Sequence, residues 1–300
     1  MNGPDGGRAD WIIPELGFAG ETERLRGAIA TWARDTVPAE LRDAVDWQFL
    51  AGSKYFRPLT VFSCARAKTG GEVPDAAIGG AIALELFHNM TLVVDDILDK
   101  SDERRGKATM HTKFGELKAL MTSGYLVAEA YRMMAGDPER IALISELMTR
   151  LAVAECAQWR MRKQPADLSD WYYLAEEDTG SMFEIAACLG DPTGDLRAFG
   201  GLLGVLYHAC DDVSDVRGTE ALGEGGDEDI RDGILTLPAA LAIRKYPEVA
   251  EMFRAPCEAN YGDLAAAFRD RLEEAEEELD RIARRAVAEA ERHARGPGRG

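Results

Sequence analysis

Several residue types and patterns are scarce in this sequence, and each scarcity excludes a class of protein. The 300 residues include only five cysteines, an odd number that shows neither the spacing of zinc ligands nor a disulfide framework. We interpret them as small buried residues of a reducing compartment; they are Cys64, Cys156, Cys188, Cys210 and Cys257. No apolar run approaches the ~18–20 residues that span a membrane, and the N-terminal region lacks the apolar core of a signal peptide. We therefore expect a soluble, cytoplasmic protein with no integral membrane segment.

Positive charge is also scarce. The chain has 35 lysines and arginines against 53 aspartates and glutamates, which gives a formal net charge of −18. Such a chain is surrounded by a negative field, which is a poor match to nucleic acids and anionic membranes. We expect no nucleic-acid partner, and any basic side chain that binds an anion must act locally.

Strand-like alternation is missing, and helical periodicity dominates instead. Apolar residues recur at three- and four-residue spacing in segments rich in Ala, Leu, Met and Glu. These segments are 76–94, 121–134, 141–162, 171–189 and 264–292. Clusters of turn-forming residues fall at 70–71, 136–138, 163–166, 190–194 and 218–233. The pattern predicts an all-α protein with one helical domain at 21–293, between flexible ends at 1–20 and 294–300.

The most distinctive local feature is an Asp-Asp-x-x-Asp pattern that follows an apolar helical run. Asp95 and Asp99 lie four residues apart and should share one helix face, with Asp96 about a third of a turn away. Like charges at this spacing destabilise a helix by roughly 0.2–0.5 kcal/mol per pair, so a cation or solvent must offset them. Carboxylate oxygens suit a hard cation such as Mg²⁺, which typically takes one or two carboxylates together with phosphate oxygens.

The same pattern recurs at Asp211, Asp212 and Asp215, again after an apolar helical run. One such cluster in an acidic protein is typical of a solvated surface, but two at the ends of apolar helices indicate a shared role. We predict that the two clusters face each other and bind metal ions, with all six aspartates as metal ligands.

Basic side chains lie near the first acidic cluster or at a helix start. Lys54 and Arg57 are three residues apart at a predicted helix start, and Arg104 and Arg105 follow the first acidic cluster. In a chain of such negative charge this grouping suggests anion binding, with arginine as a bidentate donor and lysine as a point charge. Ordinary surface ion pairs are the alternative. His88 lies two helical turns before the first acidic cluster, either as a site residue or as a satisfied core residue.

In their order along the chain, these residues resemble the trans-isoprenyl diphosphate synthases, the polyprenyl synthetase family. The likeness extends from about Gly52 to Ala242. It runs through Gly-Ser-Lys-Tyr-Phe-Arg-Pro at 52–58, Glu-Leu-Phe-His-Asn at 85–89, the first acidic cluster, Arg-Arg-Gly at 104–106 with Thr109 and His111, the segment 179–190, the second acidic cluster, and Thr-Leu-Pro at 236–238. The resemblance implies an all-α, single-domain helical bundle around a central cavity, with the acidic clusters across its mouth, and a homodimer.

The resemblance also implies a reaction. Three Mg²⁺ ions held by the two acidic clusters would clamp an allylic diphosphate and neutralise the charge that develops on the departing pyrophosphate. The double bond of isopentenyl diphosphate would then attack the allyl cation, and loss of a proton would give a trans product one C5 unit longer. The positions that correspond to isopentenyl diphosphate contacts are Lys54, Arg57, His88 and Arg105. Arg104 corresponds to a contact with the allylic diphosphate, and further substrate-binding positions are Thr179, Tyr207 and His208.

The sequence departs from the family where the allylic diphosphate is held. A lysine usually precedes the threonine at 179, and another usually follows the glycine at 233, but here these residues are Asp178 and Ile234. The exchange removes two positive charges and adds a negative one, so we expect weaker binding of the allylic diphosphate. The family's Phe-Gln before the second acidic cluster is replaced by Tyr207 and His208, and an arginine of the first basic motif is replaced by Tyr55.

We predict a Mg²⁺-dependent prenyltransferase that condenses an allylic diphosphate with isopentenyl diphosphate, because every position assigned to isopentenyl diphosphate is retained. Met90 and Thr91 would limit chain growth, and a flexible Met suggests a C15–C20 product; simple core packing of Met90 is the alternative. The loop at 218–233 is either a solvated segment or a lid that excludes water. Other functions left open are a class I terpene synthase, prenyl transfer to an unusual acceptor, a weakly active or regulatory subunit, and a helical scaffold.

Overall fold

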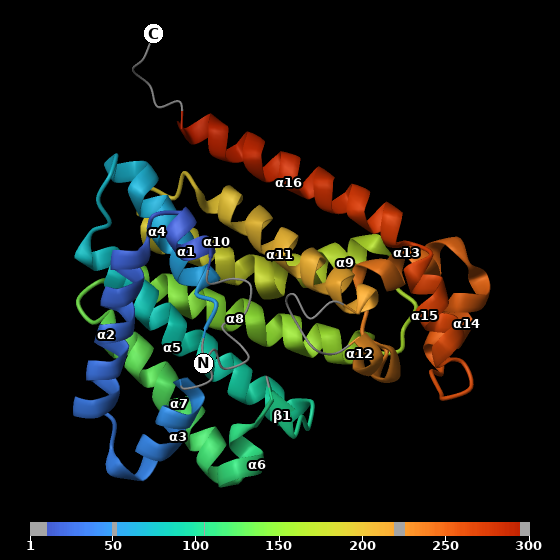
Figure 1. Ribbon diagram of the computed structural model, residues 1–300, viewed down its shortest axis with the longest axis horizontal. Coiled ribbons are helices and arrows are strands. Elements are labelled where there is room, and N and C mark those ends of the chain that lie inside the picture. Colours follow the sequence, from blue (N-terminus) through green and yellow to red (C-terminus); the bar gives the residue numbers. More distant parts are fainter. Residues whose placement is uncertain (1–10, 50–52, 105, 219–225, 295–300) are drawn as a thin grey trace. The chain divides into compact units, whose positions relative to one another are not determined.

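The computed structural model describes residues 11–49, 53–104, 106–218 and 226–294. These residues are almost entirely helical (Figure 1), which confirms the predicted all-α fold class. Contacts divide the chain into two compact units, the first formed by residues up to 144 with 186–192, and the second by 145–185 with the residues from 193 onward.

The first unit contains the helices α1 (Ile12–Glu15), α2 (Ala19–Asp35), α3 (Ala39–Phe49), α4 (Phe56–Thr69), α5 (Asp75–Leu98), α6 (Met110–Phe114) and α7 (Glu116–Met133). Two further helices, α8 (Pro138–Met161) and α10 (Ser181–Gly190), contribute residues to both units. The segment 11–20 was expected to be flexible, but it forms α1 and buries Ile13 and Phe18, which are 7% and 3% exposed. Apolar side chains inside this Gly/Pro-punctuated segment anchor it to the core.

Helix α5 forms the centre of the first unit. It is apolar around most of its circumference, so it is buried on several sides, and it packs against α4 and α7. Leu84, Leu86 and Phe87 have no solvent exposure. Among the described residues α5 is the one helix long and apolar enough to cross a membrane, contrary to the expectation that no apolar run approaches this length. Its apolar window is 78% buried inside the protein, and a core helix meets the same criteria, so this is weak evidence for a membrane span.

A short antiparallel hairpin follows α5, although no strand was predicted. Strand β1 (Glu103–Arg104) pairs with β2 (Lys107–Ala108), with Glu103 opposite Ala108 and Arg104 opposite Lys107. Gly106 in the turn has a φ of +69°, a left-handed conformation that glycine adopts without steric cost. Strands of two residues are too short to give a period-2 pattern, which explains why the sequence did not reveal them.

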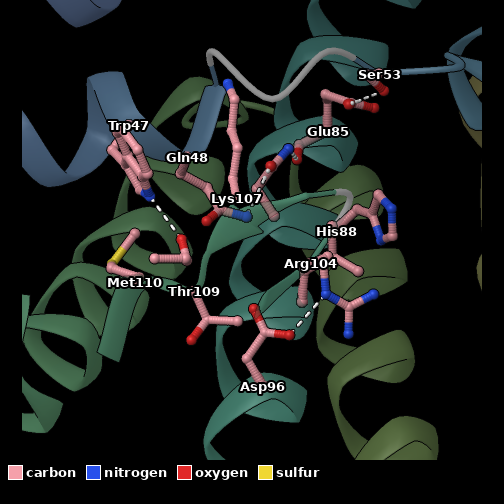
Figure 2. Close-up of a pocket in the computed structure, with 13 residues that line it drawn as sticks. Trp47, Gln48, Ser53, Glu85, His88, Asp96, Arg104, Lys107, Thr109 and Met110 are labelled. Carbon is pink, nitrogen blue, oxygen red and sulfur yellow. Dashed lines mark hydrogen bonds and ion pairs between the residues drawn. The ribbon is translucent and has the colours of Figure 1, made fainter. Parts of the chain in front are cut away.

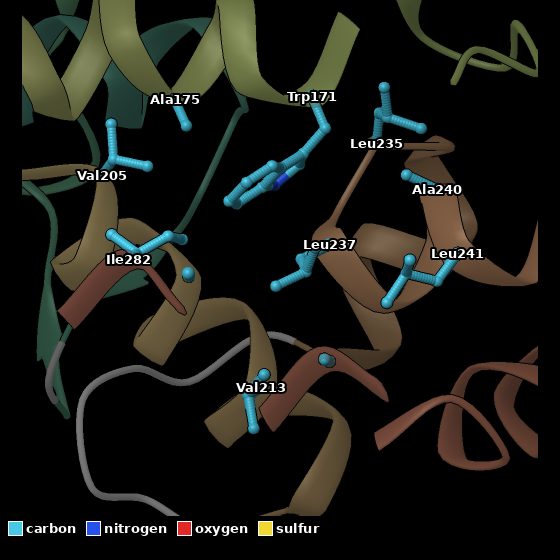
Figure 3. Close-up of a cluster of buried hydrophobic side chains, with 11 residues drawn as sticks. Trp171, Ala175, Val205, Val213, Leu235, Leu237, Ala240, Leu241 and Ile282 are labelled. Atoms are coloured by element: carbon cyan, nitrogen blue, oxygen red, sulfur yellow. The ribbon is translucent and has the colours of Figure 1, made fainter. Parts of the chain in front are cut away.

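The second unit contains part of α8 and α10 and the helices α9 (Leu168–Ala175), α11 (Arg197–Arg217), α12 (Gly226–Asp232), α13 (Leu237–Lys245), α14 (Pro247–Arg254), α15 (Tyr261–Arg269) and α16 (Leu272–Ala294). Its core surrounds the indole of Trp171, which is buried together with Val205 of α11 and Leu237 of α13 (Figure 3). Helix α16 adds Ile282 to this cluster and packs along α11.

The helical segments predicted from periodicity are confirmed, with two differences. The predicted segment 264–292 is two helices, because α15 ends at Arg269 and α16 begins at Leu272. The predicted segment 171–189 contains one π-helical turn, Glu176–Gly180, between α9 and α10. Of the predicted loop 218–233, residues 226–232 form α12, and residues 219–225 lie outside the described residues, as do residues 1–10 and 295–300 of the predicted flexible ends.

Candidate functional site

The first acidic cluster lies at the C-terminal end of α5. Asp95 is partly exposed in the last turn, and Asp99 is the exposed residue that follows the helix. The last turn of α5 contains no basic residue, and the helix dipole disfavours negative charge at this end. A cation bound here would therefore relieve an unfavourable local field.

Asp96, the middle residue of this cluster, has a different environment. Its side chain is 3% exposed, and its Oδ1 accepts a hydrogen bond from Nε of Arg104 at 2.6 Å. Burial raises the pKa of Asp96 above its ordinary value, and the Arg104 guanidinium opposes that shift. We predicted Asp96 as a metal ligand and Arg104 as a diphosphate contact, whereas the structure joins them in an ion pair that connects α5 to β1.

A pocket opens beside this ion pair, entirely within the first unit (Figure 2). Its wall is made by α3, α5, the β hairpin and the residues that precede α4. The polar side chains in the wall include Gln48, Glu85, His88, Asp96, Arg104 and Lys107. Glu85 is 2% exposed and accepts a hydrogen bond from the Ser53 hydroxyl at 2.7 Å, so its charge is held inside the fold by a local donor.

The basic residues at 54–57 lie at the start of α4, as predicted. Tyr55 precedes the helix with a φ of +55°, a left-handed turn that ends the preceding segment and begins α4. Arg57 is in the first turn of α4, and its Nη1 lies 3.1 Å from Nε2 of His88 on α5. The structure thus brings together two residues that are far apart in sequence, and His88 is part of the pocket wall. Arg105, the remaining predicted contact for isopentenyl diphosphate, lies outside the described residues.

The proposed chain-length residues lie one to two turns before Asp95 on α5. Met90 is 5% exposed and therefore part of the core of the first unit. Thr91 is partly exposed, and its hydroxyl donates a hydrogen bond to the carbonyl oxygen of His88 at 2.8 Å. The burial of Met90 fits both a wall position and simple packing.

The second acidic cluster lies near the C-terminal end of α11 in the second unit. Asp212 is its buried middle residue, and its Oδ2 accepts hydrogen bonds from the Trp171 indole at 2.8 Å and from the Leu237 backbone N–H at 2.7 Å. Burial raises the pKa of Asp212, while His208 and these two donors oppose that shift. Asp212 therefore ties α9 and the start of α13 to α11, a structural role that the prediction of six metal ligands did not include.

Asp215 and Asp211 lie four residues apart on α11, both partly exposed. Burial, together with the nearby charges of Asp211 and Asp212, raises the pKa of Asp215 to about 7. Two partly exposed carboxylates beside the buried Asp212 are costly without a counter-cation, so Asp211 and Asp215 suit a divalent metal that takes its other ligands from elsewhere.

Thr179 is placed by the π-helical turn between α9 and α10. This turn can approach α11 closely because Gly204 has no side chain: an added Cβ would lie 2.6 Å from the Thr179 carbonyl oxygen and 2.7 Å from the Gly180 Cα. One turn later on α11, Nδ1 of His208 lies 3.0 Å from the Thr179 hydroxyl. π-Helical turns inside α-helices occur frequently at functional sites.

Asp178, which stands where the family has lysine, belongs to the same group. Its Oδ2 accepts a hydrogen bond from the Thr179 hydroxyl at 3.1 Å and lies 3.8 Å from Nδ1 of His208. The other ring nitrogen of His208 lies 3.9 Å from Oδ1 of Asp212. His208 is thus flanked by two carboxylates. Tyr207, the other residue that replaces the family's Phe-Gln, packs its ring against Phe183 at 5.4 Å between centroids.

Arg150 of α8 is a residue that sequence reasoning missed. Its guanidinium donates to Glu177 at 2.8 and 3.1 Å and to Glu184 of α10 at 2.8 Å, and it also contacts the Glu176 carbonyl oxygen at 3.2 Å. These bonds clamp the π-helical turn to α8. Only the tertiary fold brings Arg150 to the turn, so no local sequence signal could have identified it.

Both acidic clusters fit a divalent cation bound jointly by protein and substrate. Among the residues that the structure describes, no three His, Cys, Asp or Glu side chains form a complete metal cage. Mg²⁺ is usually held by one or two carboxylates plus substrate phosphates, so an incomplete set of protein ligands is the expected arrangement. That the six aspartates bind metal stays a prediction, in which the outer residues, Asp95 with Asp99 and Asp211 with Asp215, are the more exposed ones. That the two clusters face each other also stays a prediction.

Comparison with known proteins gives a family match over most of the chain. The model of the polyprenyl synthetase family matches residues 38–270. Geranylgeranyl pyrophosphate synthase 3 of Arabidopsis thaliana is 30% identical over 247 residues, which cover 74% of this chain and 68% of that protein. Nonaprenyl diphosphate synthase of Mycobacterium tuberculosis is 30% identical over 252 residues, which cover 77% of this chain and 74% of that protein.

Solved structures show the same fold. Heptaprenyl diphosphate synthase from Staphylococcus aureus superposes with a TM-score of 0.82 at 25% identity and covers 90% of each chain. Polyprenyl synthase from Caulobacter crescentus, solved in complex with calcium and isoprenyl diphosphate, gives a TM-score of 0.83 at 24% identity over 97% of this chain and 96% of that one. The chain therefore belongs to the polyprenyl synthetase family and is an enzyme of the trans-prenyltransferase type.

Proposed function

We propose that this enzyme is a Mg²⁺-dependent synthase that joins an allylic diphosphate head-to-tail to isopentenyl diphosphate and forms a C15–C20 trans-prenyl diphosphate. Members of the family use these two substrate classes and a divalent metal. The observation that carries the proposal is the contact of Arg57 with His88 at 3.1 Å, beside a polar pocket of the first unit whose wall includes His88 and Arg104. A terpene cyclase uses no second diphosphate substrate and has no need of this pocket.

In this proposal Lys54, Arg57 and His88 bind the diphosphate of isopentenyl diphosphate. The guanidinium of Arg57 presents a planar fork that matches two phosphate oxygens, and Lys54 adds a point charge at the same helix start. Because Arg57 and His88 come from different helices, α4 and α5, the diphosphate is fixed relative to the end of α5. This would orient the double bond toward the reacting allylic carbon.

The outer aspartates of the two acidic clusters are the proposed Mg²⁺ ligands. When bound, the ions would supply positive charge against the charge that develops on the departing diphosphate. The allylic C–O bond breaks, the isopentenyl double bond forms the new C–C bond, and a proton leaves the extended product. Released diphosphate can accept this proton, so the proposal requires no protein base.

The proposal also specifies the length of the product. Met90, five residues before Asp95 and 5% exposed, offers a flexible side chain of intermediate size where the growing chain would run along α5. Named relatives include synthases of geranylgeranyl and of nonaprenyl diphosphate, so similarity alone does not select the length.

A second candidate, a class I terpene synthase on the same scaffold, is favoured by one observation. Asp178 places a carboxylate 3.1 Å from the Thr179 hydroxyl, where a family member usually carries a lysine for the allylic diphosphate. The exchange departs from the pattern of chain-elongating members at the allylic site, and a terpene synthase would have to hold its own prenyl diphosphate there by other groups. The two candidates differ in whether isopentenyl diphosphate is consumed.

A homodimer is also part of the proposal, and the exposed face of α7 supports it. Leu117, Leu120 and Met121 recur at three- and four-residue spacing and are 76%, 47% and 57% exposed. Apolar side chains grouped in this way favour burial against a second copy of the chain. Replacement of Leu117 and Met121 by Glu should convert a dimer into a monomer in size-exclusion chromatography with light scattering, and an unchanged mass would contradict this part.

The deciding experiment incubates the purified protein with Mg²⁺ and geranyl, farnesyl or geranylgeranyl diphosphate, each with and without isopentenyl diphosphate. Mass spectrometry then identifies the products. We expect a longer prenyl diphosphate that forms only when isopentenyl diphosphate is present. A hydrocarbon or alcohol formed without it would contradict elongation and favour the terpene synthase.

A further inference from the structure

We propose that Lys163 supplies the positive charge that is missing at residue 234 and contacts the diphosphate of the allylic substrate. The proposal rests on the function proposed above, in which this diphosphate binds at the second acidic cluster. It starts from a contact between the C-terminal end of α8 and Gly233. The next residue is Ile234, at the position where the family usually carries a lysine.

The backbone of Lys163 is joined directly to Gly233. The Lys163 N–H donates a hydrogen bond to the Gly233 carbonyl oxygen at 2.8 Å. The two residues can approach so closely because Gly233 has no side chain: an added Cβ would lie 2.5 Å from Cγ and 2.8 Å from the backbone nitrogen of Lys163. The exposed side chain of Lys163 therefore starts beside Gly233, and a flexible chain of three bonds carries the ammonium group onward from Cγ. The ammonium group can thus serve the region of residue 234.

Lys163 also has a backbone conformation that is costly for lysine. Its φ is +60°, in the left-handed region, two residues after α8 ends at Met161. Helices commonly end with glycine in this conformation, because a Cβ lies too close to the following carbonyl oxygen. Gly233, with a φ of +66° after the end of α12, follows this rule. Backbone strain is concentrated at functional sites, so the lysine at 163 indicates a role for its side chain.

The segment that follows this contact leads directly to the second acidic cluster. Four residues after the contact, the N–H of Leu237 donates to Oδ2 of Asp212 at 2.7 Å. Four residues span at most about 14 Å when extended. A turn shortens this path, since the N–H of Thr236 donates to the Ile234 carbonyl oxygen at 3.1 Å. The short connection keeps the base of the Lys163 side chain near the cluster.

The positive charge at the end of α8 acts on Asp232, the last residue of α12. The pKa of Asp232 lies below its ordinary value, chiefly because the Arg231 guanidinium donates to its carboxylate at 2.9 and 3.3 Å. The charges of Arg162 and Lys163 lower that pKa further, against the effect of burial. The end of α8 therefore brings positive charge to the segment that lacks the family's lysine. A diphosphate bound near Asp178 and the second acidic cluster would need such charge.

Substitution of the lysine tests the proposal while the backbone contact is kept. Lys163→Met retains the backbone N–H and removes only the ammonium charge. Loss of a charge-assisted hydrogen bond predicts an about tenfold higher KM for the allylic diphosphate, while the KM for isopentenyl diphosphate changes less than about twofold. Lys245→Met, at the end of α13 in the same unit, makes the same change in net charge and is the control. It should leave both constants within about twofold of wild type.

Relocation of the charge gives a sharper test. Ile234→Lys restores the family's lysine, so adding it to Lys163→Met should return the KM for the allylic diphosphate to within about threefold of wild type. Lys163→Arg keeps the charge and should stay within the same limit. A lysine that only compensates the negative C-terminal ends of α8 and α12 would behave differently. Its loss would lower the midpoint of urea unfolding and leave this KM unchanged.

A binding measurement without turnover completes the test. Inorganic pyrophosphate is titrated calorimetrically into the protein in the presence of Mg²⁺ and isopentenyl diphosphate, and Lys163→Met should bind it about tenfold more weakly than wild type. Equal affinities, an equal loss in Lys245→Met, or a loss that Ile234→Lys does not rescue would overturn the proposal and leave the proposed function intact. If wild type forms no longer prenyl diphosphate, the proposed function is wrong, and the pyrophosphate affinities still decide the role of Lys163.

Discussion

The two acidic clusters share one sequence pattern but differ in how the protein compensates their charge. In each, the middle aspartate is buried and bonded to protein donors, while the outer two are more exposed. Asp96 pairs with a guanidinium, whereas Asp212 accepts from an indole and a backbone N–H, which carry no net charge. The buried aspartate of the first cluster is therefore paired with a cation, whereas the buried aspartate of the second accepts hydrogen bonds from neutral donors and lies near His208.

This difference shows that a repeated motif need not give equivalent sites. In the second cluster, burial and the neighbouring carboxylates raise the pKa of Asp215 to about 7. We therefore expect this cluster to depend more strongly on bound metal than the first.

The largest expected effect is the loss of catalysis when either cluster loses an outer carboxylate. Asp95→Asn and Asp211→Asn should each lower kcat at least about a hundredfold, because each removes a group that would hold positive charge against the leaving diphosphate. Product formation from radiolabelled isopentenyl diphosphate measures this effect. Asp46→Asn on α3, an exposed aspartate outside both clusters, serves as the control and should retain the wild-type rate.

The middle aspartates should differ in stability. Asp212→Ala leaves the Trp171 indole and the Leu237 N–H without their buried acceptor, which predicts a loss of about 2–4 kcal/mol in the free energy of unfolding. Asp96→Ala should cost about 1 kcal/mol, because the side chain of its partner Arg104 is 39% exposed and water can replace the carboxylate. Urea unfolding of the metal-free protein compares the two, and equal losses would remove the distinction between the clusters.

Sequence reasoning succeeded where the signal was local. Helical periodicity located the main helices, and the helix ends at the acidic clusters followed from the apolar runs before them. Only the family resemblance indicated that Arg57 and His88 act together, because the two residues lie on different helices and no local pattern connects them.

The remaining features depend on tertiary structure. The π-helical turn at Thr179 forms against α11 because Gly204 and Gly180 allow close approach, and two separate glycines in a sequence do not signal this. The pairing of Asp96 with Arg104 requires the two-residue strands of the hairpin to return toward α5. The flanking of His208 by Asp178 and Asp212 likewise exists only after folding.

A third, smaller effect concerns the affinity for the allylic diphosphate. It tests whether a positive charge beside Thr179 strengthens binding of this substrate. Asp178→Lys exchanges a negative for a positive charge beside Thr179, which predicts a threefold to tenfold lower KM for the allylic diphosphate, from roughly 2 kcal/mol before screening. Glu139→Lys, an exposed position on α8, makes the same change in net charge and is the control. An unchanged KM in Asp178→Lys would show that His208 and bound metal already compensate the missing lysine.

The smallest expected effect is a pH dependence of the stabilisation by Mg²⁺, and it distinguishes the two clusters. The folded-state pKa of Asp215, about 7, lies above the ordinary value near 4, so its stabilising contribution is present at low pH and is lost as pH rises from about 4 through 7. Mg²⁺ competes with that proton, so the metal should stabilise the protein more at pH 8 than at pH 6. A threefold gain in affinity corresponds to about 0.6 kcal/mol, which thermal unfolding with and without Mg²⁺ can resolve. Asp215→Asn should abolish this pH dependence, and Asp99→Asn should preserve it. The opposite pattern would contradict the comparison, because it would place the stronger metal dependence at the end of α5, where Arg104 already supplies positive charge.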